Sequence, residues 1–319
     1  MNACECVITL TALCRRSLHT AWASCCSDFH NGHSRAFKSR TSNSASPAFF
    51  LCLYLSFIQY NPIESMMRNI NRQLEFLFAE WKDKSVRNAE HECDKHFVKD
   101  GIVLAEGKSE DIAEKEWCQA KRRIAFLLKD QNQGSKDFWD DDNRTWLTKG
   151  KSDTTFFLKI KNLFYSLYSV GKKSDRQIWI EEINKEKINS LLDSVPFVMV
   201  ECKKQPGGPD IESKVLKEYI YKYHNFLSLE LEILNPNIIV CFGGEIYDFA
   251  IHHFASDGVI KIFQNVYYDD KMKRVFLYAG HPSGRDSYKD HYEGAMYWFR
   301  KFVNKEYESE RDYFAEMFE

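Results

Sequence analysis

The sequence predicts an α/β protein, a three-layer α/β/α sandwich around a central, mainly parallel sheet of four strands. Four short runs of consecutive apolar residues are typical of strands that are buried on both faces of a parallel sheet. Stretches with helical periodicity separate these runs, and such alternation is typical of a sheet covered by helices. The four runs are Ile124–Leu128, Phe197–Val200, Ile238–Phe242 and Val275–Tyr278.

Residues 1–65 differ from the rest of the sequence. They hold six of the ten cysteines and show no sustained helical or strand period. Their apolar run, Pro47–Ile58, lies too far from the N-terminus for a secretory signal, and it is shorter than the about 20 residues that a transmembrane helix needs. Two alternatives stay open, a translation start at Met66 or Met67 and a disordered or loosely docked extension. We therefore expect residues 1–65 to be a non-native or disordered N-terminal extension.

Residues 66–120 are expected to form a helical part that packs on the main domain, residues 121–319. A first helix is predicted from about Met67 to Lys84, because its apolar residues fall on one face. A second helix is predicted over Ser109–Ala120, with Ser109 as its cap.

The main domain is expected to contain five helices between and after the apolar runs. They are Thr154–Ser169, Asp175–Ser194, Ile211–Leu234, Glu245–Phe254 and Ser287 to about Lys305. In open α/β sheets ligands bind outside the carboxyl ends of the strands. We therefore expect the functional residues directly after each apolar run.

The composition excludes several classes of protein. With 44% hydrophobic and 28% charged residues, the chain is globular and neither collagen-like, mucin-like nor largely disordered. A net charge of −2 excludes a globally basic nucleic-acid binder but not a locally basic groove. The four cysteines after Met66 form no C-x-x-C pair, so we expect reduced thiols in a cytoplasmic protein, without disulfides or a metal site. The G-x-G-x-x-G and G-x-x-x-x-G-K-[ST] fingerprints are also absent.

Polar residues and then two aromatic residues follow the first run. Asp130 or Asn132 could hold a water molecule, and Phe138 or Trp139 could stack on a planar ring. A solvated loop beside a core aromatic is the alternative.

Residues that could bind a ligand also follow the second and third runs. Glu201 ends the second strand, where an unpaired carboxylate is costly, so it either pairs with a lysine or reads a ligand donor. Lys203 and Lys204, followed by proline and glycines, fit a phosphate-binding loop and equally a solvated turn. Gly243 and Gly244 open directly into a helix, whose first amides could approach an anion, although paired glycines often only form a tight turn.

The fourth run is followed by a histidine in a Gly-His-Pro-Ser-Gly-Arg segment, residues 280–285. A histidine held by a following proline at a strand end can donate a hydrogen bond to developing negative charge. A lone histidine is usually structural, but His281 has Ser283 and Arg285 beside it and a predicted helix directly after it.

Together these strand ends resemble the uracil-DNA glycosylase superfamily over about Arg122 to Phe302. The most specific piece is the His-Pro-Ser at 281–283, which with Gly284 and Arg285 is similar to the H-P-S-P-R motif of the single-strand-selective monofunctional branch. Residues 130–134 are similar to the G-M-N-P-G motif of that branch in the asparagine and the last glycine. Residues 235–244 look like the superfamily's P-x-hydrophobic-G strand. Residues 201–206 resemble the T-N-x-x-K segment of the iron–sulfur branch, but the cysteines that bind the cluster in that branch have no match in this sequence.

The resemblance implies a monofunctional DNA glycosylase that hydrolyses the N-glycosidic bond of a flipped base, leaves an abasic site and uses no cofactor or metal. It implies that Asn132 positions the water, with Asp130 as a second candidate, and that His281 stabilises the leaving base anion. Glu201 would read the base edge, Phe138 or Trp139 would stack on the base, and Arg285 would wedge into the duplex. The other expected DNA contacts are Lys203, Lys204, Gly243, Gly244 and Ser283.

The expected base follows from Glu201. A carboxylate accepts hydrogen bonds but cannot donate them, so it suits the exocyclic amino group of a cytosine derivative, such as a modified base of viral DNA. That substrate would give the protein a defence role. The alternatives are a uracil-excising repair enzyme, a non-enzymatic module that binds a nucleotide or a protein, and a Rossmann-like hydrolase of small molecules that uses Asp130 and His281. No lysine is well placed on the sequence for a Schiff base, so strand cleavage is not predicted. The expected partner is single- or double-stranded DNA, with no membrane and no obligate protein partner.

Overall fold

The computed structural model describes residues 69–134, 137–145, 154–171, 183–208, 211–285 and 287–318. The expectation for residues 1–65, and the first part of the helix predicted to begin at Asp175, lie outside these residues.

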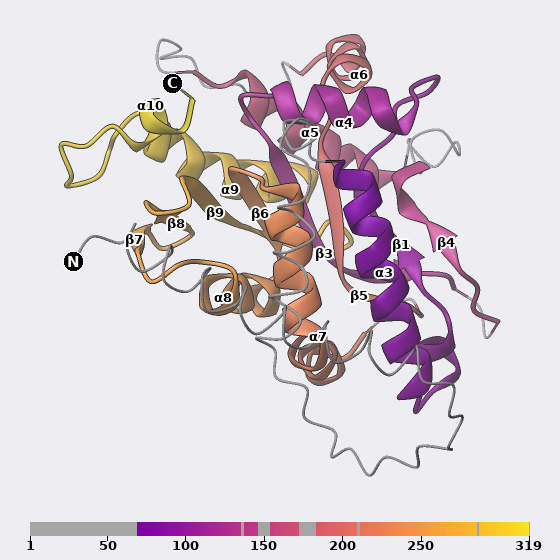
Figure 1. The fold of residues 1–319 in the computed structure, drawn as a ribbon. Helices are drawn as coiled ribbons and strands as arrows, with labels where there is room; N and C mark the ends of the chain where they lie inside the picture. Colours follow the sequence, from indigo (N-terminus) through magenta and orange to yellow (C-terminus); the bar gives the residue numbers. More distant parts are fainter. Residues whose placement is uncertain are drawn as a thin grey trace, which may run out of the picture. The chain divides into compact units, whose positions relative to one another are not determined.

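A mixed sheet of seven strands forms the centre of the described part, in the order β2-β5-β3-β6-β9-β8-β7 (Figure 1). Its four middle strands are mutually parallel. They contain the four predicted apolar runs and are β3 (Ile124–Asn132), β5 (Val198–Gly207), β6 (Ile238–Phe242) and β9 (Arg274–Ala279). The α/β class is therefore confirmed.

The expectation of a four-stranded sheet was wrong, because three further strands extend it at both edges. On one side β2 (Gly101–Ile102) pairs antiparallel with β5. On the other side β8 (Val266–Asp269) pairs antiparallel with β9, and β7 (Val259–Phe263) with β8. Two further short strands, β1 (Val98–Lys99) and β4 (Asp141–Asp142), form a separate parallel pair.

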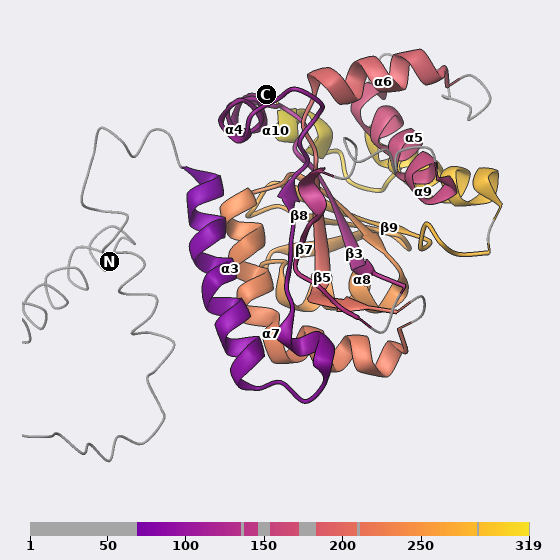
Figure 2. The ribbon, with the colours of Figure 1, turned by 90° about the vertical axis from the view of Figure 1, so that its right-hand side faces the viewer.

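Helices cover both faces of the sheet, and Figure 2 shows α3 and α7 on one side with α5 and α9 on the other. Successive residues of a strand point to opposite faces, so Phe126 of β3 joins one hydrophobic core and Leu127 the other. This double burial explains why the four runs are apolar throughout. One core includes α5 (Thr155–Ser169), α6 (Lys185–Ser194), α9 (Tyr288–Val303) and α10 (Tyr313–Phe318). The other includes α3 (Ile70–Arg87), α4 (Glu110–Gln119), α7 (Ser213–Leu234) and α8 (Gly244–His253).

Side-chain caps fix where several helices begin. The Ser109 side chain accepts a hydrogen bond from the amide of Ile112, as predicted, and Thr154 and Ser287 cap α5 and α9 in the same way. Two short 3₁₀ helices, Glu92–Lys95 and Asn143–Thr145, complete the regular structure of the described residues.

The order of the parallel strands places a topological switch point at β3. The chain passes from β3 through α5 and α6 to β5 on one side, and from β5 through α7 to β6 on the other side of β3. These two connections pack on opposite faces of the sheet. In doubly wound sheets the ligand-binding crevice lies outside the carboxyl ends of the strands at such a point.

Two of the predicted strand ends lie further along the chain than expected. β3 continues through Asp130 to Asn132, and β5 continues through Glu201 and Lys204 to Gly207. These polar residues were expected in loops, but they continue the pairing of β3 with β5 past the level at which β6 ends. In β5 the extension buries these side chains, whereas Asn132 at the end of β3 is exposed.

Candidate functional site

The register of the strands shows which residues lie side by side at the carboxyl edge. Leu127 of β3 pairs with Cys241 of β6, which pairs with Tyr278 of β9. Phe242 of β6 also pairs with Ala279 of β9. Lys129, Gly243 and Gly280 follow these paired residues in the sequence, and His281 comes directly after Gly280. The site is built around this row of strand-end residues.

His281 lies at the end of β9, as predicted, and its ring has a defined tautomer. The backbone amide of Ser283 donates a hydrogen bond to Nδ1 at 3.3 Å, so the ring proton is on Nε2. Burial lowers the pKa of His281 to about 4, with smaller contributions from the charges of Lys129, His291 and Lys159. At neutral pH the imidazole is therefore uncharged and donates from Nε2.

The turn after His281 is tight. The amide of Gly284 donates to the carbonyl of His281 at 2.7 Å, and a Cβ atom on Gly284 would lie 2.9 Å from that oxygen. The buried Lys159 of α5 donates to the carbonyl of Gly284 at 3.2 Å. Ser283 and Arg285 are exposed, which is compatible with the DNA contacts expected of them.

Asp130 faces the neighbouring strand β5. Its side chain is 7% exposed, and one carboxylate oxygen lies 3.4 Å from Nζ of Lys203. It also lies so close to Gly207 that a Cβ atom there would be 1.9 Å from Oδ2. Burial raises the pKa of Asp130, although Lys203 and Lys129 lower it in part. A carboxyl group with a raised pKa is suited to accept a proton near neutral pH.

Glu201 is enclosed in the interior, where its expected role as reader of the base edge is not available. Its side chain is 1% exposed, and Oε1 accepts a hydrogen bond from the Asn143 side-chain amide at 3.2 Å. Burial raises the pKa of Glu201 well above its ordinary value, and Asp100 and Asp130 raise it further. Burial therefore favours the uncharged form of this carboxyl group and removes it from the surface where a base would bind.

The expected phosphate contacts of Lys203 and Lys204 were also wrong, because both side chains are buried. Lys204 is 0% exposed and forms ion pairs with Asp100 and Glu230. Lys203 donates to the carbonyl of Gln205 at 2.6 Å and lies over the ring of Tyr219. These lysines hold β5 to its neighbours.

Asn132 does not meet Glu201 around one cavity. Glu201 pairs with Leu128, whereas Asn132 pairs with Gly207, so Asn132 lies four residues or about 13 Å further along β3. The Asn132 side chain is exposed. Asn132 and Glu201 therefore do not converge as predicted, because Glu201 is enclosed in the interior and Asn132 is exposed further along β3.

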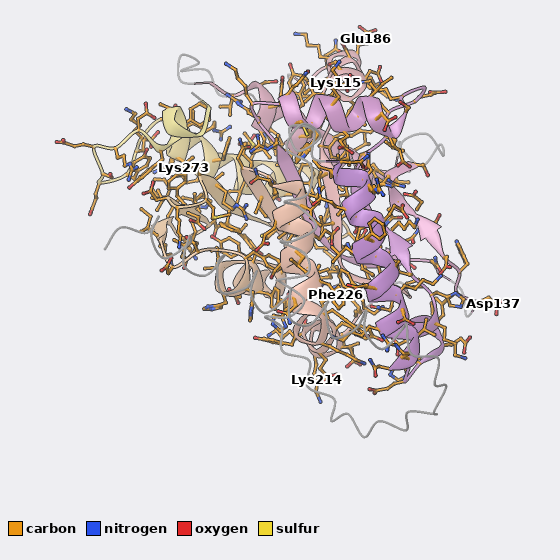
Figure 3. The ribbon with its side chains drawn as sticks, in the orientation of Figure 1. Lys115, Asp137, Glu186, Lys214, Phe226 and Lys273 are labelled. Carbon is orange, nitrogen blue, oxygen red and sulfur yellow. The ribbon has the colours of Figure 1, made fainter. Side chains whose placement is uncertain are left out.

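The aromatic residues after β3 differ in exposure. Trp139 is 46% exposed, and Phe138 is half-buried. The side-chain amide of Gln133 accepts from the Trp139 amide at 3.0 Å and donates to its carbonyl at 2.8 Å. Figure 3 shows Asp137, in the same loop, pointing outward at the edge of the described part. The backbone of Trp139 is thus held by Gln133, and its ring is exposed.

Gly243 and Gly244 join β6 to α8. Gly243 has a φ angle of 113°, which a residue with a side chain rarely adopts, and its amide donates to the carbonyl of Ala279 at 3.0 Å. Glu245 lies in the first turn of the helix, and its carboxylate accepts a hydrogen bond from Ser213.

Lys129 is the residue of this site that the sequence reasoning missed. It is half-buried, and its Cε atom lies 3.8 Å from the position that a Cβ atom on Gly243 would occupy. The signal was present, because Lys129 directly follows the apolar run of β3.

Two surface hollows lie away from this row. One, of about 350 Å³, is formed by α5 and α6, and the other, of about 250 Å³, by α7 and α8. Among the described residues, no group of three or more His, Cys, Asp or Glu side chains could hold a metal ion. Within the same residues, no helix is both long and apolar enough to cross a membrane.

Comparisons with known proteins do not add to this picture. No family model matches the chain, and no curated protein matches it.

Proposed function

We propose that this protein is a monofunctional DNA glycosylase that hydrolyses the N-glycosidic bond of an extruded base and leaves an abasic site. The observation that carries the proposal is the neutral His281 at the carboxyl edge of the sheet, with its proton on Nε2. When the bond to the sugar breaks, its electron pair passes to the base. A neutral imidazole can donate a hydrogen bond to the resulting anion in a site of low polarity, where such donors contribute most.

In this proposal Asp130 orients the attacking water and accepts its proton. The water oxygen forms a bond to the sugar carbon as the bond to the base breaks. Asp130 is favoured over Asn132, because its carboxyl group is buried and burial raises its pKa, whereas Asn132 is exposed. Asn132, exposed further along β3, is better placed to contact the DNA outside the reacting centre.

Extrusion of a base costs a few kcal/mol and needs groups that replace its lost stacking. The exposed Arg285, next to His281, is the proposed wedge. The exposed ring of Trp139 is the proposed stacking surface, and Ser283 with the Gly243–Gly244 turn completes the proposed DNA contacts.

The burial of Glu201 changes the proposed base. Because Glu201 does not reach a base at the surface, it no longer favours a cytosine-type base over uracil. Modified cytosine, with its defence role, and uracil, with its repair role, are therefore equal candidates. We also propose that the fold is a three-layer sandwich, since helices cover both faces of the sheet. The proposed location is the cytoplasm, since Cys93, Cys202 and Cys241 are free thiols.

The test is a panel of single- and double-stranded DNAs that contain uracil, cytosine or modified cytosines, assayed for abasic sites with an aldehyde-reactive probe. The wild type is expected to form abasic sites on at least one DNA, and Asp130→Asn to reduce the single-turnover rate by at least 100-fold. Wild-type protein that forms no abasic site on any DNA of the panel overturns the proposal.

A non-enzymatic DNA-binding module is the second candidate. The burial of Glu201 and the exposure of Asn132 favour it, because two expected pocket residues do not line a common pocket. DNA binding by the wild type without any abasic product would select this candidate.

A further inference from the structure

His291 of α9 is a buried histidine to which the proposed reaction gives no role. The residue is 3% exposed, and its ring stacks on Phe242, the last residue of β6, with the ring centroids 5.9 Å apart. It lies near the start of α9, where its amide donates to the carbonyl of the capping Ser287 at 3.0 Å. The hydrophobic core and the helix backbone therefore hold this ring in a defined position.

The His291 ring binds the residue directly before His281. Its Nε2 atom lies 2.7 Å from the carbonyl oxygen of Gly280. A carbonyl oxygen only accepts hydrogen bonds, so Nε2 of His291 carries a proton and donates. Gly280 lies directly beyond the last residue pair of β6 and β9, Phe242 with Ala279. A partly buried carbonyl group in such a place needs a partner, which the imidazole supplies.

This hydrogen bond acts on His281 through a single peptide bond. The Gly280 carbonyl group and the His281 amide nitrogen belong to one planar unit, so the bond from His291 fixes the plane from which His281 departs. The rest of the turn then sets the His281 ring, because the Ser283 amide donates to its Nδ1 at 3.3 Å and the Gly284 amide donates to its carbonyl at 2.7 Å. Rotation of that plane would change the direction in which Nε2–H of His281 donates.

Both histidines belong to the same face of the sheet. The His281 ring lies beside Phe156 of α5, with centroids 6.2 Å apart, and His291 stacks on Phe242. Phe156 and Phe242 pack in the hydrophobic core that α5 and α9 cover, and Figure 2 shows these two helices on one side of the sheet. The hydrogen bond from His291 thus reaches the His281 segment without crossing the sheet.

We propose that His291 is a positioning residue, which holds the Gly280 carbonyl so that Nε2–H of His281 points at the departing base. This inference rests on the proposed glycosylase function and deepens it. His291 keeps its proton and does not touch the substrate, so it adds no covalent step. A misplacement of about 1 Å at the reacting centre can cost about 100-fold in rate, so the loss of this bond should lower the rate of base release rather than the DNA affinity.

The kinetic test compares His291→Phe and His291→Gln with a matched control, Tyr292→Phe. Phenylalanine keeps a ring but has no donor, whereas the glutamine amide can still donate to the Gly280 carbonyl. Tyr292 is the next residue of α9, is 1% exposed and shares a hydrogen bond with Ser166 of α5, so the control loses a buried hydrogen bond away from Gly280. At saturating DNA, His291→Phe is expected to lower the single-turnover rate about 10- to 100-fold, while His291→Gln recovers most of this loss and the control is unchanged.

A double-mutant cycle shows whether His291 acts through His281. In a His281→Ala background, His291→Phe is expected to cause no further loss of rate, because no imidazole is left to position. Three outcomes overturn the inference: a wild-type rate in His291→Phe, an equal fold loss with and without His281, and an equal loss in Tyr292→Phe. Should His291→Phe not fold, His291→Asn replaces it, because its shorter side chain withdraws the donor from Gly280.

A second readout needs no activity. The amides of Ser283 and Gly284 both donate to His281, so their hydrogen exchange reports whether this segment stays in place. His291→Phe is expected to speed the exchange of both amides about 10-fold, while His291→Gln and Tyr292→Phe leave it unchanged. Unchanged exchange in His291→Phe overturns the role of His291 alone. Wild-type protein that releases no base overturns the proposed function.

Discussion

The contact between Gly207 and Asp130 gives the sharpest structural prediction. A Cβ atom on Gly207 would lie 1.9 Å from Oδ2 of Asp130, whereas ordinary contacts of this kind begin at about 3.4 Å. In Gly207→Ala the carboxylate must therefore move by about 1.5 Å, away from its position opposite Lys203. A misplacement of about 1 Å can cost about 100-fold in rate, so we expect at least that loss of single-turnover base release.

The same substitution should cost little stability. Overpacking by a single methyl group destabilises a protein by about 1–3 kcal/mol, which urea unfolding will measure. Gly208→Ala is the matched control, because nothing lies within 4 Å of a Cβ atom at that position. A fully active Gly207→Ala variant would refute the reasoning, since the position of Asp130 would then not matter for catalysis.

Three further predictions concern stability and binding. Lys204→Met should lower the free energy of unfolding by about 3–5 kcal/mol, because it leaves the buried Asp100 and Glu230 without their cation. Lys214→Met, at an exposed position, should leave the free energy of unfolding unchanged. Equal urea midpoints for the two variants would contradict this prediction. The pKa of His281 is lowered to about 4 on folding, so the folded state binds fewer protons and stability should fall by up to about 3 kcal/mol as the pH drops from about 6.5 to 4. This slope should shrink in His281→Gln, as measured by urea unfolding across that range, and an identical slope in both proteins would count against it. Trp139→Ala should weaken binding of single-stranded DNA by about 1–3 kcal/mol in a fluorescence anisotropy titration. Tyr297→Ala, at another exposed ring, should leave the affinity unchanged. Equal losses of affinity would show that the effect is not specific to Trp139.

The sequence predicted the parallel strands well because burial on both faces leaves only apolar residues in them. The edge strands lack that signal. None of the residues of β7 is fully buried, and β2 has only two residues, whose partner β5 is distant in sequence.

The strand ends were harder to predict for a related reason. The residues from Asp130 to Asn132 and from Glu201 to Lys204 are polar, and polar residues after an apolar run are typical of loops. They extend the strands because partners from elsewhere satisfy them, such as Asp100 for Lys204. His281 was found because its proline and glycine neighbours mark a turn, whereas the burial of Glu201 depends on Asn143, which no local pattern reveals.

The central claim is that neutral His281 stabilises a departing base. The most direct measurement is mass spectrometry of the free base released from the DNA panel at pH 7 by the wild type and by His281→Ala. We predict an intact free base from the wild type and a release rate at least 100-fold lower from the variant. Equal release by both proteins, or no free base from either, would contradict the account.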